Sequence, residues 1–461
     1  MPVSTARRIA YDVLRQVESE GAHAADALHA ELSTKIKQED AALATELTLG
    51  VLRWQRLLDF MLGQRVSRPF TELDRPVRLA LRIGLYQLRY LDRIPARAAV
   101  SESVELAKRA KKQSAAGLVN AVLRKAADTA REPAEKIAPA DLDPADRVAL
   151  IHSHPTWLVK RWLGRWGEES TRALLAANNA PHTLALAVHD AARLGDVRKE
   201  LETAGLEVKP GRWLKSSLNV IGGAAAVVVA QSAAWKQGWV SMQDEASQTV
   251  PLLLSVAAGQ RVLDVCAAPG GKTVPLAQAA GGGAVIAADH DARRLAAVRA
   301  HLQRTGVSKV QLAAFDAAAG IAVAGAFDRI LCDVPCSGTG TLRRNPEIRW
   351  RLRAEDLSSY HAKQARILRN AVAALAPGGR LVYATCSLEP EENEHVVREV
   401  IASNPELKLL PAGEALARHL RDSKQAAELT DSQGFFRTLP HQHGADGFFA
   451  AVLERGAPTA A

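Results

Sequence analysis

Residues 261–273 read Arg261-Val262-Leu263-Asp264-Val265-Cys266-Ala267-Ala268-Pro269-Gly270-Gly271-Lys272-Thr273. The beginning of this stretch is rich in valine and leucine, which favours a short buried strand. The glycine pair that follows lets the backbone approach a ligand closely at the start of a helix. The stretch therefore predicts a strand, a tight turn and a helix, the repeating unit of α/β domains.

Two phosphate-binding interpretations of the glycine turn are weak. A P-loop requires a glycine five residues before Gly271, where this chain has Cys266. The Gly-x-Gly-x-x-Gly pattern of dinucleotide sites is absent from the turn. An ordinary tight turn between a strand and a helix remains as the alternative to a ligand site.

Short apolar runs recur after this unit, and helical stretches separate most of them. Alternating strands and helices predict right-handed crossovers and a mostly parallel sheet with helices on both faces. Two final runs have no helix between them, which predicts an antiparallel hairpin at the edge of the sheet. The predicted strands are 285–288, 310–313, 329–331 and 381–384, and the hairpin pairs 435–439 with 447–453.

An aspartate stands at or just after the end of three of these strands. Asp289 could accept hydrogen bonds from ribose hydroxyls, Asp316 could accept from an adenine amino group, and Asp333 follows the next strand. Each aspartate alone is also a good turn or helix-cap residue. Because ligands bind at the carboxyl ends of strands in a doubly wound sheet, the set favours an adenosine ligand without a phosphate clamp. That description points to S-adenosylmethionine.

The four cysteines do not form a disulfide framework in a chain of 461 residues, and they favour a reducing compartment. Free cysteine is often a small buried hydrophobic residue, and Cys332, inside a predicted strand, fits that description. Cys266 is expected to serve packing or the shape of the glycine turn. Cys336 and Cys386 each follow a strand and precede turn-like residues, and two thiols that converge on one cleft indicate covalent chemistry.

Methylation of carbon 5 of cytosine is a reaction that needs such a thiol. A thiolate that adds to carbon 6 makes the ring an enamine, and carbon 5 then attacks the sulfonium methyl group. A proton must leave carbon 5 before the thiolate is eliminated. Asp333 could hydrogen-bond the cytosine edge and stabilise charge as the thiol adds, and a second thiol could assist release.

The first 130 residues carry most of the surplus positive charge. They hold 21 Lys and Arg against 15 Asp and Glu, a net charge of +6, whereas the whole chain has 59 against 50 and a net charge of +9. Apolar residues recur every three or four positions over 43–61 and 77–88, which predicts helices. Two more helices are predicted around 100–104 and 118–122, with Gly117 as the break between them. We therefore expect a small basic helical bundle that favours a polyanionic partner.

The remaining boundaries follow from composition. Prolines among Ala, Asp and Glu predict a linker over 131–155, and a Trp-rich helix with short strand-like runs predicts a small α/β subdomain over 156–232. The large α/β domain is expected over 233–456 and a tail over 457–461. Because neither a secretory signal nor an apolar run of bilayer length is visible, a cytoplasmic multidomain protein with no membrane contact is expected.

Several segments together resemble the RNA cytosine-5 methyltransferases of the NOL1/NOP2/Sun family. The resemblance implies a Rossmann-like class I methyltransferase domain that uses S-adenosylmethionine. It also implies that Cys386 is the nucleophile, that Cys336 aids product release, and that Asp333 and Lys272 belong to the catalytic set. The matching segments are Asp264–Thr273, Asp333–Gly340, Tyr383–Ser387, Glu391-Glu392-Asn393 and, ahead of the domain, Gln243-Asp244-Glu245-Ala246-Ser247.

The same resemblance assigns the other site residues. It implies that Arg343, Arg344 and Arg349, in the basic run 342–350, contact RNA phosphate, and a solvated basic loop is the alternative. The resemblance also implies that the site contains no metal ion. The implied cofactor-binding residues are Cys266, Ala267, Ala268, Pro269, Gly270, Gly271, Lys272, Asp289, Asp316 and Asp333.

The N-terminal region resembles a second known protein. Pro95–Leu106 and Leu118–Arg124 are similar to the antitermination factor NusB, an RNA-binding helical bundle. A NusB-like domain, a small RNA-recognition-motif-like subdomain and this methyltransferase domain are the arrangement of the Sun/RsmB-type bacterial 16S rRNA methyltransferases. The resemblance implies a monomer that methylates cytidine 967 of 16S rRNA, free or in an early small-subunit particle. A transfer RNA substrate, or a non-catalytic ribosome-assembly or antitermination role, remains the alternative.

Overall fold

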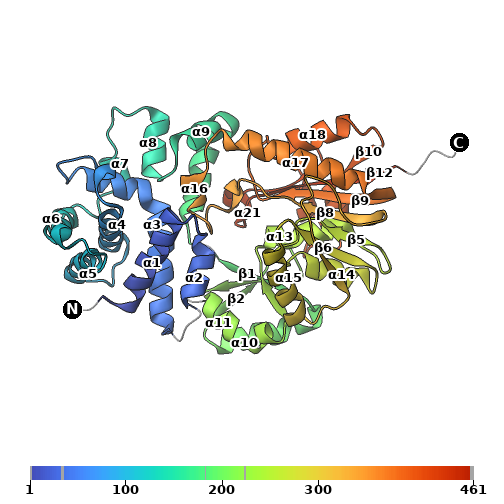
Figure 1. Cartoon of the computed structure of the whole chain (residues 1–461), viewed down its shortest axis with the longest axis horizontal. Helices are drawn as coiled ribbons and strands as arrows, with labels where there is room; N and C mark the ends of the chain where they lie inside the picture. The colour runs from blue at the N-terminus through green and yellow to red at the C-terminus, as the bar shows by residue number, and fades with distance from the viewer. Residues whose placement is uncertain (1–2, 33–35, 182, 223–224, 457–461) are drawn as a thin grey trace. The chain divides into compact units, whose positions relative to one another are not determined.

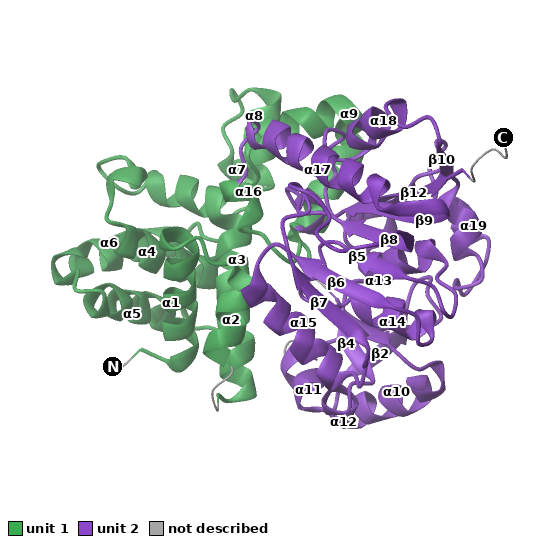
Figure 2. Cartoon of the chain, turned by 45° about the vertical axis from the view of Figure 1, so that its right-hand side comes forward, with its two compact units in different colours: residues 1–182, 342–351 green, residues 183–341, 352–461 purple. Residues whose placement is uncertain are grey.

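The computed structural model describes residues 3–32, 36–181, 183–222 and 225–456. They form two compact units, which Figure 2 colours separately. Unit 1 contains residues 1–182 and 342–351, and unit 2 contains residues 183–341 and 352–461. The chain therefore enters unit 1 twice, the second time through a short segment that includes α16 (Ile348–Arg351) and is green in Figure 2.

The first part of unit 1 is a bundle of amphipathic helices around one apolar core. Leu47, Val51 and Met61 of α3 are buried in that core, as their spacing predicts. Gly117 lies inside α6 and does not separate two helices, because the break comes earlier, at residues 110–115. The helices, labelled in Figure 1, are α1 (Thr5–Ser19), α2 (Ala24–Leu32), α3 (Gln38–Gly63), α4 (Arg75–Tyr90), α5 (Ala96–Arg109) and α6 (Ala116–Ala127).

The region predicted as a linker also belongs to unit 1. It contains α7 (Ala134–Ile137) and α8 (Pro144–Ile151), and α8 places Leu150 and Ile151 in the bundle core. α9 (Thr156–Asn179) follows in the same unit. The two compact units divide after residue 182, and the domain boundaries at 130 and 155 stay predictions.

Unit 2 begins with a small antiparallel sheet in the strand order β2-β3-β1-β4. Helices flank this sheet, so the predicted small α/β subdomain is confirmed. Its strands are β1 (Leu184–Val188), β2 (Glu207–Pro210), β3 (Ser217–Ile221) and β4 (Val240–Met242). Its helices are α10 (Leu194–Thr203), α11 (Ala225–Gln231) and α12 (Ala233–Lys236).

The large sheet of unit 2 has the order β10-β12-β9-β8-β5-β6-β7. The strands from β9 to β7 along this order are parallel, as predicted. β5 comes first in the chain and lies between β6 and β8, so the strand order reverses beside it. Ligands bind at such a switch point in open α/β sheets. The strands are β5 (Val262–Asp264), β6 (Val285–Asp289), β7 (Val310–Ala314), β8 (Phe327–Asp333) and β9 (Leu375–Thr385).

Helices connect most of these strands and cover the faces of the sheet (Figure 1). Strands buried on both faces are the reason why the sequence shows continuous apolar runs without alternation. The longer helices are α14 (Thr273–Ala280), α15 (Ala292–Arg304), α17 (Asp356–Ala373) and α18 (Glu394–Ala402). The short ones are α13 (Glu245–Thr249), α19 (Ala412–Leu416), α20 (Gln425–Glu428) and α21 (Pro440–His443).

The terminal hairpin is present, with one correction to its place. β11 (Phe436–Thr438) pairs antiparallel with β12 (Phe448–Arg455), and β12 pairs antiparallel with β9. β10 (Leu407–Leu410), which the sequence analysis did not predict, pairs with the outer side of β12. β12 is therefore an inner strand of the sheet and not an edge strand.

Candidate active site

The glycine turn connects β5 to α14 at the switch point of the sheet. Gly270 has φ +105°, a backbone conformation that favours glycine, and an added Cβ would lie 3.3 Å from the backbone of Val298. A Cβ on Gly271 would lie 3.4 Å from the side chain of Gln243. Gly270 is therefore required by backbone conformation, and both positions leave little room for a side chain.

The residues of the turn before the glycines differ in exposure. Ala267 is buried and its N–H donates to the carbonyl of Ala288 at 2.8 Å, so the turn is fixed to the end of β6. Cys266 and Ala268 are partly buried and Pro269 is exposed. Burial raises the pKa of the Cys266 thiol, which fits a packing role and does not favour a reactive thiolate.

Asp289 lies at the end of β6 and is 2% exposed, so it is not a solvated turn residue. Its carboxylate accepts from the N–H groups of Ala268, at 3.3 Å, and Asp291, at 3.2 Å. Asp291, rather than Asp289, caps α15. Asp316, after β7, is exposed and accepts from the N–H of Ala318 at 3.0 Å.

Asp264, the last residue of β5, has a buried oxygen that lacks a partner. Its Oδ2 accepts from the Thr273 hydroxyl at 2.7 Å, whereas Oδ1 has no hydrogen-bond partner among the described residues. Burial raises the pKa of this carboxyl to about 7. A buried acceptor without a partner costs about 1–3 kcal/mol. The residues around β5 therefore fit a ligand that carries positive charge or hydrogen-bond donors.

Lys272 and Asp333 form an ion pair across the ends of β5 and β8. Lys272 Nζ donates to Asp333 Oδ2 at 2.5 Å, and both side chains are mostly buried. The Lys272 ammonium also lies 5.3 Å from the ring centre of Phe448. The pair thus connects the glycine turn to the loop that carries Cys336.

The two cysteines predicted to act together are adjacent. Cys336 Sγ lies 3.3 Å from Cys386 Sγ, and both residues are half-buried. They follow β8 and β9, which are neighbouring parallel strands. The hydrogen bond with Cys386, followed by burial, raises the pKa of the Cys336 thiol. The two sulfur atoms are within hydrogen-bond distance, and either thiol can be the donor.

Glu392 is a buried residue of this site to which the sequence analysis gave no role. Its side chain hydrogen-bonds to Ser337 and Ser387, the residues that follow the two cysteines. It was present in the Glu391-Glu392-Asn393 run, but no strand-end or spacing rule assigns a function to a glutamate there.

The three arginines expected to contact RNA lie in the segment of unit 1. Arg343 is 8% exposed, Arg344 is half-buried and Arg349 is 1% exposed. The Arg349 guanidinium donates to the carbonyls of Ser153, at 3.1 Å, and Arg53, at 3.3 Å, and to Asn179 Oδ1 at 2.9 Å. The expectation that Arg349 contacts phosphate is therefore wrong for this structure, because its donors point into the interior of unit 1. Phosphate contact by Arg343 and Arg344 stays a prediction.

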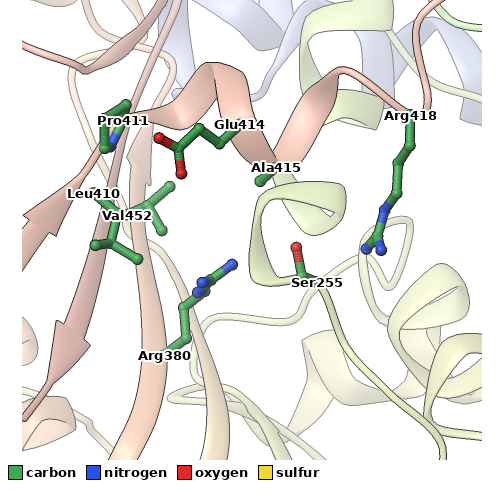
Figure 3. Close-up of a pocket in the computed structure, with 8 residues that line it drawn as sticks. All are labelled: Ser255, Arg380, Leu410, Pro411, Glu414, Ala415, Arg418 and Val452. Carbon is green, nitrogen blue, oxygen red and sulfur yellow. The ribbon is translucent and has the colours of Figure 1, made fainter.

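None of the residues discussed above lines a second feature of unit 2, a cavity of about 230 Å³. Arg380, Glu414 and Arg418 are among its lining residues (Figure 3). Arg380 is five residues before the end of β9, and Ser255, also in the lining, precedes β5. The cavity is therefore near the amino ends of the parallel strands, whereas the cysteines and aspartates lie at their carboxyl ends.

The described residues contain neither a membrane-spanning helix nor a metal-binding cluster. Within those ranges no helix is long and apolar enough to cross a membrane. No group of three or more His, Cys, Asp or Glu in the same residues is arranged to hold a metal ion.

Three family models match this chain. Residues 251–454 match the 16S rRNA methyltransferase RsmB/F model, residues 4–128 match the NusB family, and residues 154–226 match the ferredoxin-like domain of RsmF/B-like methyltransferases. The last match begins in α9, which is part of unit 1. Together these matches cover the helical bundle, strands β1 to β3 of the small sheet and the large sheet.

Individual proteins show the same likeness. The Ribosomal RNA small subunit methyltransferase B of Pseudomonas putida is 38% identical over 423 residues, 91% of each chain. The Probable ribosomal RNA small subunit methyltransferase B of Bacillus subtilis is 31% identical and covers 99% of this chain and 100% of its own. The crystal structure of PH0851 superposes with a TM-score of 0.80 at 26% identity, covering 99% of this chain and 100% of that one. The chain therefore belongs to the RsmB/F family of 16S rRNA methyltransferases, with a NusB-family domain in its N-terminal part.

Proposed function

We propose that this protein methylates carbon 5 of a cytidine in small-subunit ribosomal RNA through a covalent bond between Cys386 and carbon 6. The observation that carries the proposal is the 3.3 Å separation of the Cys336 and Cys386 sulfur atoms at the ends of neighbouring strands. One thiol suffices to add to the ring. A second thiol at hydrogen-bond distance can assist a later step of the same reaction.

Cys386 is assigned as the nucleophile by the family resemblance, which matches it to the cysteine that attacks the ring. In the proposal a thiolate must form before addition, and the thiol gives up its proton to solvent in that step. Addition forms a bond between Cys386 Sγ and carbon 6 and makes carbon 5 nucleophilic.

The later steps use Cys336. After carbon 5 has received the methyl group, a base must take its proton so that the bond from Cys386 to carbon 6 can break. In the proposal Cys336, in its thiolate form after losing its own proton to solvent, takes the proton from carbon 5. The double bond between carbons 5 and 6 forms again, and the electron pair of the broken bond returns to Cys386 as a thiolate. Asp333, held by Lys272, is positioned to hydrogen-bond the cytosine edge as charge develops on the ring.

S-adenosylmethionine, when bound, supplies an electrophilic methyl group on a sulfonium centre. The proposed residues for holding it are those of the glycine turn, from Cys266 to Lys272, with Asp289, Asp316 and Asp333. Two observations support this assignment: Asp289 is buried at the end of β6, and Asp264 has an oxygen without a partner among the described residues. A ligand that carries positive charge compensates the negative charge of such buried carboxylates.

The substrate proposal rests on relatives. Proteins 31–38% identical to this chain are named as ribosomal RNA small subunit methyltransferase B. Family resemblance extends this to cytidine 967. A monomer in the cytoplasm that acts on free 16S rRNA or on an early particle stays a prediction.

The test is a covalent-adduct assay with single-cysteine variants. Wild type should form a denaturation-resistant adduct with RNA that carries 5-fluorocytosine, because fluorine cannot leave carbon 5 as a cation. Cys386→Ala should form neither adduct nor product. Cys336→Ala should accumulate an adduct even with ordinary RNA, since addition proceeds and release is impaired.

Cys332→Ala is the matched control, because Cys332 is fully buried inside β8 and should behave as wild type. An adduct with Cys386→Ala and none with Cys336→Ala would reverse the assignment. Bisulfite sequencing of RNA from a deletion strain then identifies the substrate. Loss of a ribosomal mark supports the proposal, loss of a transfer RNA mark moves the substrate, and no loss points to a non-catalytic factor.

A further inference from the structure

Glu392 lies in the turn between β9 and α18, and its side chain is fully buried. A carboxylate has two oxygens and about four acceptor positions, and burying it without donors is costly. Burial raises the pKa of Glu392, while hydrogen bonds from its neighbours act in the opposite direction. The partners of its two oxygens therefore explain why the residue is tolerated there.

Each carboxylate oxygen of Glu392 accepts from two donors. Oε1 accepts from the N–H of Ser337 at 2.8 Å and from Gln364 Nε2 at 3.0 Å. Oε2 accepts from the Ser387 hydroxyl at 2.5 Å and from the Ser337 hydroxyl. The two hydroxyl oxygens are themselves 3.0 Å apart. Donors from three separate segments thus meet at one side chain.

Ser337 and Ser387 place these contacts next to the thiols. Ser337 follows Cys336 directly, and Ser387 follows Cys386 directly. The loops also touch through their backbones, because the N–H of Gly340 donates to the carbonyl of Cys386 at 2.9 Å. An added Cβ at Gly340 would lie 2.8 Å from that carbonyl oxygen, so only glycine permits the approach.

The turn that carries Glu392 is fixed independently. Tyr383, in β9, donates its hydroxyl to the carbonyl of Glu392 at 2.6 Å. Asn393 accepts from the Thr385 hydroxyl at 2.5 Å and donates to the carbonyl of Ser387 at 2.9 Å. Hydrogen bonds to the backbone of Glu392 and to Asn393 therefore fix the position of this turn. That position does not depend on hydrogen bonds from the serine hydroxyls.

We propose that Glu392 is a positioning residue that sets the separation of the Cys336 and Cys386 sulfur atoms by joining the two loops that carry them. It hydrogen-bonds to neither sulfur, and so it acts through Ser337 and Ser387. The consequence for turnover rests on the proposed two-cysteine chemistry, whereas the sulfur separation itself does not. A misplacement of about 1 Å can reduce a reaction rate by about 100-fold.

The first experiment measures the sulfur separation without RNA or cofactor. Phenylarsine oxide bridges two close thiols by forming two sulfur–arsenic bonds with loss of water. Intact-mass and peptide mapping should find a Cys336–Cys386 bridge in the wild-type protein. Glu392→Ala should bind the reagent about tenfold more weakly or worse, since Ser337 and Ser387 lose their shared acceptor.

Conservative and control variants separate positioning from folding. Glu392→Gln keeps an oxygen for the Ser337 N–H and Gln364 and an amide that can donate to both serine hydroxyls, so bridging should stay within about threefold of wild type. Glu399→Ala is the matched control on α18, because Glu399 pairs with His361 and Arg369 and not with the cysteine loops. It should bridge like wild type.

The second experiment measures methyl transfer by the same variants. Glu392→Ala should lower kcat by about 100-fold, with the KM for RNA and the Kd for cofactor nearly unchanged, and Glu392→Gln should recover most of the rate. If Glu392→Ala does not fold, Ser337→Ala/Ser387→Ala removes the hydroxyl donors and should weaken bridging in the same direction.

The bridging assay tests the positioning role, and the methyl-transfer assay tests the proposed function, so each proposal can be contradicted without the other. Unchanged bridging in folded Glu392→Ala, or in the double serine variant when that one is used, overturns the positioning role whatever the enzyme methylates. If wild type bridges but makes no 5-methylcytosine, the proposed function fails, and loss of bridging in Glu392→Ala still supports the positioning role. Equal losses of bridging in Glu392→Ala and Glu399→Ala would show general destabilisation and overturn it.

Discussion

The carboxylate of Glu392 and the guanidinium of Arg349 are both almost completely buried, and their surroundings differ. Glu392 receives hydrogen bonds from side-chain hydroxyls, an amide and one backbone N–H in the loops that carry the thiols. Arg349 donates mainly to backbone carbonyls of helices and turns in unit 1, and its neighbour His154 has a pKa lowered by burial, which keeps the ring neutral.

This difference in partners indicates a different role for each of the two buried charged residues. Glu392 joins loops whose strands are already fixed by the sheet, so its removal should change loop positions more than stability. Arg349 fastens a ten-residue segment to unit 1, so its removal should change stability more than chemistry. Burial of a charge alone does not distinguish these roles, whereas the identity of its partners does.

The largest expected effect tests this comparison at Arg349. Arg349→Met leaves several buried carbonyls without a donor, and unit 1 should lose about 2–4 kcal/mol of stability. Urea unfolding followed by tryptophan fluorescence measures the loss. Arg124→Met, at an exposed arginine of α6, should change stability by no more than about 0.5 kcal/mol. Equal stability of the two variants would contradict the structural role of Arg349.

A second prediction extends the comparison to the carboxylate at the end of β6. Asp289→Ala should weaken S-adenosylmethionine binding by about 10- to 100-fold, because charge-assisted hydrogen bonds to the ligand are lost. Isothermal calorimetry measures the Kd. Asp291→Ala, which removes only the cap of α15, should leave the Kd nearly unchanged. If both variants bind equally well, Asp289 has no ligand role.

A third prediction concerns pH and Asp264, which unlike Glu392 has an oxygen without a partner among the described residues. Its pKa of about 7 means that the carboxyl is neutral below and ionised above that pH. Because the methyl donor is a cation, its affinity should fall by up to about tenfold from pH 8 to pH 6. Calorimetry across this range checks the slope, and Asp264→Asn should abolish it.

The stability of the ligand-free protein should depend on pH with the opposite sign. The raised pKa means that the folded state binds more protons than the unfolded state between about pH 4 and pH 7. The contribution of Asp264 to stability is therefore lost as pH rises through 7. A thermal scan series of wild type against Asp264→Asn isolates this contribution, and identical pH profiles would contradict the raised pKa.

The smallest expected effect concerns RNA binding by unit 1. Lys111, Arg124 and Lys125 are exposed, and replacing all three with glutamine should make the dependence of RNA affinity on salt shallower by about 0.7–0.9 for each phosphate that is no longer neutralised. Lys408→Gln, at an exposed position of β10, is the control and should leave the slope unchanged. An unchanged slope in the triple variant would mean that this surface binds something other than RNA.

Much of the large sheet could be predicted because its strands are buried on both faces and read as continuous apolar runs. The strand ends then placed Asp289, Cys336 and Cys386 at one edge without any knowledge of contacts. β10 was missed because Leu407–Leu410 is only four residues long and contains a lysine.

The rest of the site depends on contacts between residues far apart in the chain. The run from Arg343 to Arg349 has the composition of a basic loop, and only the acceptors in unit 1 reveal that Arg349 is interior. Glu392 meets Gln364 and Ser337 across 28 and 55 positions. These contacts cannot be predicted from the spacing of the residues in the sequence, because only the folded sheet brings the residues together.

The second entry of the chain into unit 1 has a consequence for the order of synthesis. Unit 1 is complete only when residue 351 has left the ribosome, which is 169 residues after residue 182. At about 5–20 residues per second, the helices of unit 1 wait about 10–30 s for the segment that carries Arg349. During that interval the carbonyls that Arg349 later contacts lack this donor, and the growing protein presents an incomplete helical unit to chaperones.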